Sequence, residues 1–434
     1  MRWELGLDQM ALLAIVPHQG MTDASHMKEL WLFTTRFPHG FREAFLENEL
    51  PVLCDRFEKV IIFPEHADGE LRPIPTNAEV RHPIADPFKG ATAMTMLLNA
   101  GVVFKLLRSL LKEAPSLKKL REQWPYLRAR IGQFIHRAEV IRRDLMPGYD
   151  PDRVVVYTYW THDWTTVLGV VRESERRLRY FSRAHGFDIY EQQNHNAWIP
   201  FRSFQLEHVE RVYCASRTGM EHLQARHPLI KERFTLARLG TSDHGPGPHD
   251  PSGPLKIVSC SFIIPRKRLL LLVEVLKRVT VPVRWVHFGS GEEEERVRKA
   301  AGDLPPNIQV EFKGTMQNAD IMAWYRTHPV DVFVHLAELE GGVAVAAQEA
   351  ASFGIPLLVA DSGGVRDLVN ARTGVLLPQD PNPYDVARLL NGFQAGPMAD
   401  PTFRAGVRQA WAEGFEAHGV FHAFVDQVLR EYAS

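Results

Sequence analysis

Two glutamates on either side of a glycine turn are the residues of this sequence best suited to chemistry. Glu340 stands just before Gly341-Gly342, and Glu349 stands further on, in a run of residues with helical spacing. A glycine turn that opens a helix presents free backbone N–H groups and the positive end of the helix dipole, which together attract phosphate. The stretch Leu336–Gly364 therefore predicts a phosphate-facing turn with a carboxylate on each side.

Two roles remain open for each glutamate. Glu340 either meets a sugar near the reacting end of a ligand, or it only caps the helix or lies at the surface. Glu349 either accepts hydrogen bonds from a ribose diol or belongs to a buried ion pair. The functional interpretation requires that the N-terminus of the helix faces a phosphate.

A run of three cations, Arg266-Lys267-Arg268, follows the predicted strand Leu255–Cys260. Cations in a loop at the end of a strand could neutralise a diphosphate. A solvated basic turn is the structural alternative.

Histidines at strand ends are further candidates. His185 follows the predicted strand Leu178–Ser182, and the adjacent Gly186 permits close approach of a ligand. Its ring could donate to a ligand oxygen or exchange protons. The chain has 19 histidines, so most must be structural, and Thr161-His162-Asp163 presents the same two alternatives.

A glycine pair, Gly289-Ser290-Gly291, precedes another helical segment and on its own suggests a dinucleotide fold. Glu294 stands where the third glycine would be, and four consecutive acids, Glu292–Glu295, open the helix. Acids suit the N-terminus of a helix but would repel a pyrophosphate at the turn. The pattern argues against an NAD site.

Strands that alternate with helical segments must position these residues. The first half predicts strands at Leu30–Thr35, Lys59–Pro64, Arg153–Thr158, Leu178–Ser182, Arg211–Ala215 and Arg233–Ala237, and an irregular loop over Glu65–Lys89. The second half predicts six, at Leu255–Cys260, Val283–Phe288, Ile308–Lys313, Asp331–Leu336, Pro356–Ala360 and Gly374–Leu377. This alternation predicts an α/β protein of two doubly wound domains, with ligands in the cleft outside the carboxyl ends of the strands.

The domain boundaries follow from composition. Thr241–Pro254 is rich in Gly, Pro, Ser and Asp and cannot build an element, so residues 241–254 are predicted to be a linker. We predict one domain over 27–240, a second over 255–402, and a helical tail over 403–434 that packs across the domains. Residues 1–26 are expected to be an extension without function, either non-native or disordered.

The helical region 101–143 is strongly basic. It holds eleven Lys/Arg and three Glu, a local net charge of +8, together with large apolar residues such as Phe104 and Trp124. One hypothesis is a surface that contacts an anionic membrane. The alternative is ordinary helices with one core face and one solvated face.

The overall composition excludes several classes of protein. With 434 residues, 45% hydrophobic and 24% charged, and a net charge of −1, the chain resembles an ordinary globular protein and gives no case for nucleic-acid binding. Three cysteines without a paired motif indicate a reduced, cytoplasmic protein. No apolar stretch reaches the roughly 18–20 residues of a membrane span.

Several ordered motifs resemble the retaining, two-domain glycosyltransferases of family 4, whose fold is called GT-B, and look closest to the exopolysaccharide, colanic-acid-type branch. The resemblance runs from about Lys28 to the C-terminus and is most specific in the second half. The matching stretches are SRAHGFDIY (182–190), IPFR (199–202), RLG (238–240), VSCSFIIPRKR (258–268), HFGSGEEEE (287–295), VEFKGTMQN (310–318), EGGVAVAAQEAASFGIPLLVADSGG (340–364) and TGVLL (373–377).

The resemblance implies a role for each motif residue. Glu349 matches the family glutamate that binds the nucleotide ribose, and Glu340 resembles its partner near the donor sugar and the reaction centre. Lys267 matches the diphosphate-binding lysine, and His185 resembles the histidine that contacts the donor sugar. These imply His185, Glu340 and Lys267 as catalytic residues.

The remaining implied residues bind the two substrates. The first domain would take the acceptor, and the second would bind the nucleotide sugar. The donor-binding set is Arg266, Arg268, Gly289, Gly341, Gly342, Val343 and Glu349. His39 and Gly40 stand where the family places its acceptor-side loop.

Three departures from the family pattern affect the site. Eight residues separate Glu340 from Glu349 where the family usually has seven, so the extra residue lies in the glycine turn. Phe262 replaces an arginine often found five residues before the lysine, and Arg266 or Arg268 would substitute for it. Asp367 stands where the family commonly has glutamate.

The resemblance therefore predicts a retaining hexosyltransferase. It would move a sugar from a nucleotide-diphosphate sugar to a hydroxyl of a saccharide or lipid-linked saccharide in polysaccharide or glycoconjugate biosynthesis. No cofactor or metal is expected, and the protein would be cytoplasmic, with peripheral membrane contact through residues 101–143. The alternatives are a non-catalytic homologue that binds a nucleotide sugar or a partner enzyme, and a nucleotide-sugar epimerase.

Overall fold

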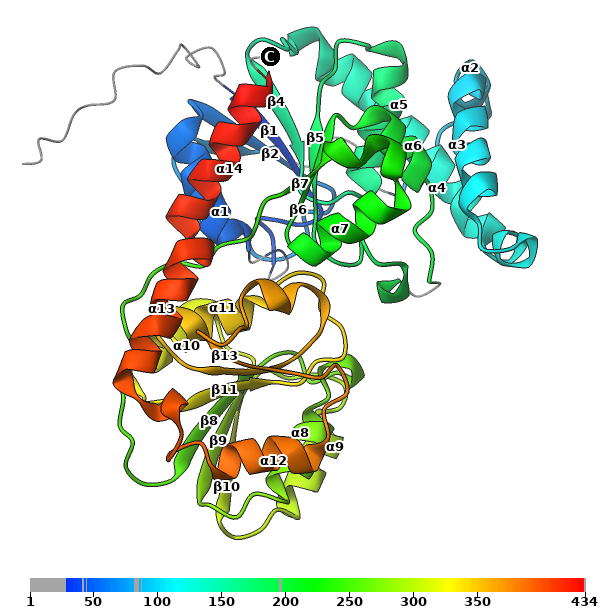
Figure 1. Ribbon diagram of the computed structural model, residues 1–434. Coiled ribbons are helices and arrows are strands. Elements are labelled where there is room, and N and C mark those ends of the chain that lie inside the picture. The colour runs from blue at the N-terminus through cyan, green and yellow to red at the C-terminus, as the bar shows by residue number, and fades with distance from the viewer. Residues whose placement is uncertain are drawn as a thin grey trace, which may run out of the picture.

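The computed structural model describes residues 29–432, except for 41, 42, 44, 82–85, 87, 195 and 196. The predicted extension, residues 1–26, lies outside the described residues. Figure 1 shows two sheets, one above the other, with helices around each.

The first domain is built on a seven-stranded parallel sheet of order β3-β2-β1-β4-β5-β6-β7. Its strands are short, and all except the two edge strands are buried on both faces, as expected where helices cover a parallel sheet. They are β1 (Glu29–Thr34), β2 (Lys59–Pro64), β3 (Ala78–Val80), β4 (Val154–Thr158), β5 (Phe181–Ala184), β6 (Arg211–Cys214) and β7 (Phe234–Leu236).

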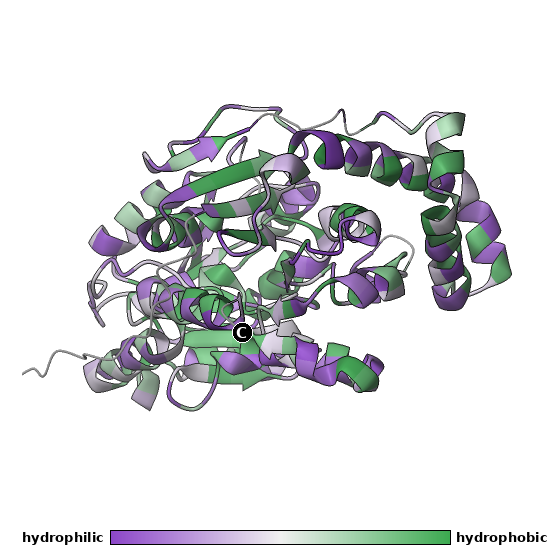
Figure 2. Cartoon of the chain, turned by 90° about the horizontal axis from the view of Figure 1, so that it is seen from above, coloured by the Kyte–Doolittle hydropathy of each residue, from purple (hydrophilic) through white to green (hydrophobic). Residues whose placement is uncertain are grey.

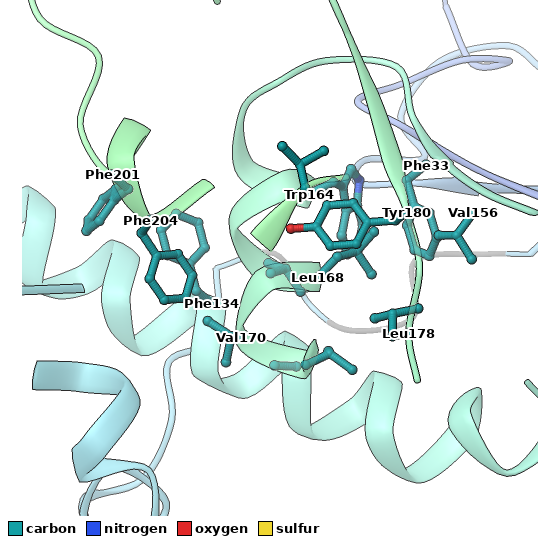
Figure 3. Close-up of a cluster of buried hydrophobic side chains, with 14 of the residues drawn as sticks. Phe33, Phe134, Val156, Trp164, Leu168, Val170, Leu178, Tyr180, Phe201 and Phe204 are labelled. Atoms are coloured by element: carbon teal, nitrogen blue, oxygen red, sulfur yellow. The ribbon is translucent and has the colours of Figure 1, made fainter. Parts of the chain in front are cut away.

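Seven helices of the first domain connect these strands. They are α1 (Leu46–Arg56), α2 (Ala93–Leu98), α3 (Ala100–Glu113), α4 (Leu117–Asp144), α5 (Asp163–Ser174), α6 (Arg202–His208) and α7 (Arg217–Arg226). Helices α5 and α6 and the second half of α4 pack on the sheet through a cluster that includes Phe134, Trp164 and Phe204 (Figure 3).

The second domain has a six-stranded parallel sheet of order β10-β9-β8-β11-β12-β13. Its strands are β8 (Leu255–Cys260), β9 (Val283–Phe288), β10 (Ile308–Gly314), β11 (Val332–His335), β12 (Leu357–Ala360) and β13 (Gly374–Leu377). Its helices are α8 (Leu269–Leu276), α9 (Glu294–Gly302), α10 (Asn318–Thr327), α11 (Val345–Ser352) and α12 (Pro383–Asn391).

Two helices at the C-terminus join the domains. Helix α13 (Pro401–Phe415) packs on α11 of the second domain, and α14 (Ala417–Tyr432) packs on α1 of the first (Figure 1). The start of the linker runs beside their junction, where the Thr241 N–H donates to the Phe415 carbonyl at 2.9 Å and the Ala417 N–H donates to the Thr241 carbonyl at 3.0 Å. The chain therefore crosses between the domains twice, at one place.

The prediction of two doubly wound α/β domains is confirmed. The six predicted strands of the second domain all form, three of them with the predicted ends. In the first domain the predicted irregular loop Glu65–Lys89 was wrong in part, because Ala78–Val80 pairs with β2 as an edge strand. Strand β5 begins at Phe181 rather than at Leu178, since pairing with β4 starts there.

Candidate active site at the domain interface

The loop between β11 and α11 carries Glu340, and the helix itself carries Glu349. The helix begins at Val345, after the glycine turn, and the first turn of a helix leaves its N–H groups without partners inside the helix. The sequence predicted this strand, turn and helix, and the structure forms them in that order.

Glu340 is held between two cationic or polar side chains. Its carboxylate forms an ion pair with Lys267 and accepts a hydrogen bond of 2.6 Å from His335 Nε2, the last residue of β11. Burial alone would raise the pKa of Glu340, but the Lys267 charge and the His335 hydrogen bond outweigh it and hold that pKa at about 2. Glu340 is therefore ionised at neutral pH.

Glu349 lies in a different environment. Its side chain is 8% exposed, and its Oε1 accepts a hydrogen bond of 2.6 Å from the Asn318 amide at the start of α10. Burial raises the pKa of Glu349 to about 7, and the Asn318 hydrogen bond offsets only part of that effect. The partner of Glu349 is thus an amide rather than the cation of a buried ion pair.

The three cations after β8 point in different directions. Lys267 faces Glu340, whereas Arg268 donates from Nε to the Leu336 carbonyl at 2.7 Å and from Nη2 to the Gln379 carbonyl at 2.6 Å. Arg266 is exposed. A small cavity at this end of the sheet is lined by Lys267 and His335, among others. Only Lys267 therefore joins the carboxylate cluster directly.

Gly289 allows the ends of neighbouring strands to pack closely against one another. It has φ of +128°, its N–H donates to the Gly314 carbonyl at 2.8 Å, and a Cβ there would lie 2.0 Å from the Ser261 carbonyl oxygen. Close packing of three strand ends accounts for this glycine. The exposed ring of Phe262 lies in the same loop region.

His185 lies at the end of β5 in the first domain. Its ring packs against Tyr159 and Trp160, with centroid distances of 4.7 and 4.4 Å. His185 Nδ1 is 3.9 Å from Asp188 Oδ2, too far for a hydrogen bond, and neither ring nitrogen has a hydrogen-bond partner among the described residues. Buried polar atoms without a hydrogen-bond partner need an explanation, and a bound ligand that supplies the partner is one explanation.

The two domains touch where His185 meets the glycine turn. A Cβ on Gly341 would lie 2.4 Å from the Gly186 Cα and 2.7 Å from the His185 carbonyl oxygen, distances that real side chains do not adopt. A Cβ on Gly186 would meet the Gly341 Cα at 2.7 Å. Two glycines thus bring His185 of the first domain beside Glu340 and the turn of the second.

Asp367 of the second domain also contacts the first domain. Its Oδ2 accepts hydrogen bonds from the Arg217 N–H at 2.9 Å and from Arg238 Nε at 3.4 Å, both in the first domain. Arg217 is the first residue of α7, so the carboxylate also faces the positive end of that helix. The shorter side chain is therefore long enough to reach across the domains.

The acceptor-side loop of the sequence prediction, His39 and Gly40, follows β1. The Gly40 N–H donates to the Glu70 carbonyl at 2.9 Å, and His39 forms an isolated antiparallel β-bridge with Leu71. Glu43 accepts hydrogen bonds from the Arg36 and Phe37 N–H groups, each at 2.7 Å, and from Trp160 Nε1 at 2.6 Å. Because Trp160 packs on His185, Glu43 connects this loop to the histidine.

Three residues that line the candidate site were not predicted from the sequence: His335, Asn318 and Trp160. His335 was assigned to a strand, although its place at the strand's carboxyl end, five residues before Glu340, was a usable signal. Asn318 ends one of the matching stretches but received no role. No local signal marked Trp160, because its contacts come from the fold.

A cluster able to hold a metal ion is not found in the described part of the chain, where no three His, Cys, Asp or Glu side chains gather suitably. The expectation that no metal is needed stays a prediction. None of the described helices is long and apolar enough to cross a membrane.

Comparison with known proteins identifies relatives of this chain. Residues 247–401 match the family model described as "Glycosyl transferases group 1". The chain is 26% identical over 278 residues to the "Putative colanic acid biosynthesis glycosyltransferase WcaL" of Escherichia coli, covering 62% of this chain and 65% of that protein. It is 43% identical over 252 residues to a "GDP-mannose-dependent alpha-mannosyltransferase" of Mycolicibacterium smegmatis, covering 54% and 63%. Each match thus spans less than two thirds of the relative's own length.

Solved structures share the fold at low sequence identity. The lipopolysaccharide outer core galactosyltransferase WaaB, in its apo form, aligns with a TM-score of 0.65 at 13% identity, covering 93% of this chain and 99% of that one. Anabaena Alr3699/HepE in complex with UDP aligns with a TM-score of 0.62 at 16% identity, again covering 93% and 99%. The predicted GT-B fold is confirmed.

Proposed function

We propose that this protein is a retaining glycosyltransferase. It moves a sugar from a nucleotide-diphosphate sugar to a hydroxyl of a saccharide or lipid-linked saccharide, in the biosynthesis of a polysaccharide or glycoconjugate. The family match over 247–401 and the named glycosyltransferases among the relatives support the reaction class. The HepE structure was solved with UDP, which favours a nucleotide-linked donor.

One observation carries the proposal: His185, whose ring nitrogens have no hydrogen-bond partner among the described residues, lies beside the Gly341 turn. The Lys267–Glu340 pair stands next to that turn on the second domain. A donor sugar at this place would receive a hydrogen bond from the histidine while its diphosphate reached the lysine. Each domain would then supply part of one site.

The leaving diphosphate needs positive charge as its bond to the sugar breaks. Lys267 supplies a cation, and the N-terminal N–H groups of α11, after Val343 and the glycine turn, supply oriented dipoles. Lys267 is already positioned by Glu340, so little reorganisation is needed during the reaction. Arg266, exposed at the same loop, completes the proposed donor site.

Glu349 is assigned to the nucleotide. Its carboxylate accepts one hydrogen bond from Asn318 and has lone pairs left for a ribose diol. Hydroxyl donors would favour its charged form and lower its pKa below about 7 on binding. Donor binding should therefore release a proton near neutral pH.

Retention of configuration requires that the acceptor attacks from the face that the diphosphate leaves. The leaving phosphate oxygen can take the acceptor's proton on that face, so the proposal needs no separate base. The acceptor would approach along the first domain, near the loop of His39 and Gly40. Closure of the two domains around the site would exclude water and limit hydrolysis of the donor.

The test is a panel of UDP-, GDP- and ADP-sugars scored by thermal shift and by donor hydrolysis. At least one nucleotide sugar should stabilise the protein and be consumed slowly without an acceptor. If no member of the panel binds, the proposed function is wrong. The anomeric configuration of the product, read by NMR, then decides between retention and inversion.

A non-catalytic nucleotide-sugar-binding protein is the second candidate. The exposed Phe262 and the neutralised charge of Lys267 favour it, because both reduce the positive charge available to a diphosphate. Donor binding without turnover on any acceptor would support this candidate, and turnover would eliminate it.

A further inference from the structure

The outer faces of α2, α3 and the first half of α4 expose an unusual set of apolar side chains. Among the described residues thirteen large hydrophobic side chains are exposed, and eight of them lie on these three helices. Six are aliphatic, sulfur-containing or phenyl side chains: Met94, Leu97, Leu98, Phe104, Leu111 and Leu117. The other two are Trp124 and Tyr126. We call these eight residues the α2–α4 surface.

The α2–α4 surface is separate from the part of α4 that belongs to the core. From Leu127 onward α4 buries residues such as Ile131 and Phe134 against α5 and α6. Three basic side chains of the predicted region are likewise used inside the domain, because Arg137 pairs with Glu65, Arg130 with Asp163 and Lys105 with Glu173. The core interpretation of 101–143 therefore holds for the second half of α4 and for the inner face of α3, where Leu106 and Leu110 are buried in the same cluster.

The cations that remain exposed lie among the apolar residues of the α2–α4 surface. They are Arg108, Lys112, Lys118, Arg121 and Arg128. Between Thr92 and Ala129, which the structure describes throughout, Glu122 is the one exposed acid. In Figure 2 apolar and polar residues are mixed along these helices, at the right of the view. The surface is thus both apolar and positively charged.

We propose that the α2–α4 surface binds an anionic lipid bilayer. Exposed apolar side chains that gather on one part of a protein mark contact sites. Leucine and phenylalanine side chains would enter the acyl boundary, Trp and Tyr would lie at headgroup level, and Lys and Arg would meet lipid phosphates. The helices would lie along the membrane, and none would cross it.

Charge distinguishes this occupant from a second copy of the chain. In a two-fold dimer the same patch meets itself, so the five exposed cations would face five others. An anionic bilayer instead complements them. The inference goes beyond the proposed function, and vesicle binding needs no sugar donor, so either proposal can fail without the other.

Co-sedimentation of the full chain with lipid vesicles tests the proposal. The protein should bind phosphatidylcholine vesicles that contain phosphatidylglycerol, bind vesicles of phosphatidylcholine alone much more weakly, and dissociate as salt is raised. In the triple variant K112Q/K118Q/R121Q, each neutralised cation should lower the partition coefficient roughly fivefold. The variant L97S/L98S/F104S should lower the partition coefficient at least tenfold, because three apolar side chains would no longer be buried in the bilayer.

Matched variants elsewhere control for surface changes as such. L229S removes a leucine that is 93% exposed in the first domain, and R176Q/R388Q removes two exposed cations. Both should bind vesicles as the unaltered protein does. Equal binding to the two vesicle types, or no effect of the two α2–α4 variants, would overturn the proposal. So would a dimer in solution that these variants dissociate, without any vesicle binding.

Discussion

Glu340 and Glu349 are nearly buried carboxylates of one short segment, yet their surroundings shift their pKa values in opposite directions. Glu340 faces Lys267 and His335, and its pKa is about 2. Glu349 accepts a hydrogen bond from the Asn318 amide and has no cationic partner among the described residues, and its pKa is about 7. Burial acts on both in the same sense, so the difference comes from the partners. A carboxylate with a cation stays charged in a buried place, and one with an amide does not.

The comparison separates a permanent charge from a conditional one. Ionised Glu340 pairs with Lys267 at the domain interface. Glu349 can take up or release a proton near neutral pH, so its charge responds to what binds there. The two glutamates thus suit different tasks: orientation of a cation, and recognition of a group that donates hydrogen bonds.

The largest expected effect is on turnover when Lys267 is replaced. K267M removes the cation beside the proposed diphosphate and should lower kcat by about 10²–10³-fold, as loss of one transition-state donor does. Steady-state kinetics with a donor identified by the panel would measure it. K299M, which changes an exposed lysine on α9, is the control. Full activity of K267M would show that the pair with Glu340 is only structural.

Removal of the Glu349 carboxylate should weaken binding of the donor. E349A deletes the acceptor of the proposed ribose hydrogen bonds, and hydrogen bonds to a charged group contribute about 1.5–3 kcal/mol, so donor affinity should fall at least tenfold. Isothermal titration with the nucleotide diphosphate would measure it. The matched change of an exposed acid, E295A, should leave affinity unchanged. An E349A protein that binds as tightly as the original would refute the ribose assignment.

Glutamine at the two positions should change stability with opposite signs. E340Q leaves the Lys267 charge without its partner and should lower the free energy of unfolding by about 3 kcal/mol at pH 7. The stabilisation by Glu340 is present above its unfolded pKa, near 4.5, and is lost as the pH falls toward about 2. The deficit of E340Q should therefore disappear in acid.

E349Q should do the reverse. The raised pKa of Glu349 means that stability is full below about pH 4.5 and declines as the pH rises through about 7, where a buried charge forms. E349Q removes that charge and should raise stability on the order of 2 kcal/mol at pH 8, with little change at pH 4.5. Urea unfolding between pH 4 and 8 measures both glutamine variants. Curves that shift in the same direction would show that the two environments are alike.

The smallest expected effect concerns the glycine turn between the two carboxylates. G341A would place a Cβ 2.4 Å from the Gly186 Cα and should push the domains apart, whereas G342A meets its nearest atom at 3.6 Å, an ordinary contact. Small-angle scattering should show a slightly larger radius of gyration for G341A than for the unaltered protein. The radius of gyration of G342A should not change. Identical scattering of the two variants would mean that the domains do not meet at this turn in solution.

Much of the fold could be predicted because its signals are local. Strand patterns of four to seven residues between helical segments identified every strand of the second domain. Strand β3 was missed because Ala78–Val80 is short and only partly buried, and its pairing with β2 depends on the rest of the sheet. The start of β5 was misplaced for the same reason, since register with β4 defines it.

For the candidate site, the sequence predicted residues but not the partners that they have in the structure. Arg266, Lys267 and Arg268 looked equivalent, and only Lys267 faces a site carboxylate. The position of Glu340 after the extra residue in the turn could not be derived from spacing, because the Gly186 contact and the Lys267 pair fix the turn together. The basic region 101–143 likewise divided into core and surface only when the helices packed.

The sequence by itself determined the order of strands and helices, the glycine turn before α11, and the chemical types available at the strand ends. These depend on periodicity and on residue conformation within a few positions. Tertiary structure alone decided that Lys267 meets Glu340 across 73 residues of chain, that His185 meets Gly341 from the other domain, and that the Glu349 carboxylate meets the Asn318 amide. The reason is physical: a carboxylate's charge depends on burial and on its neighbours in space, and neither can be read from the residues adjacent to it in sequence.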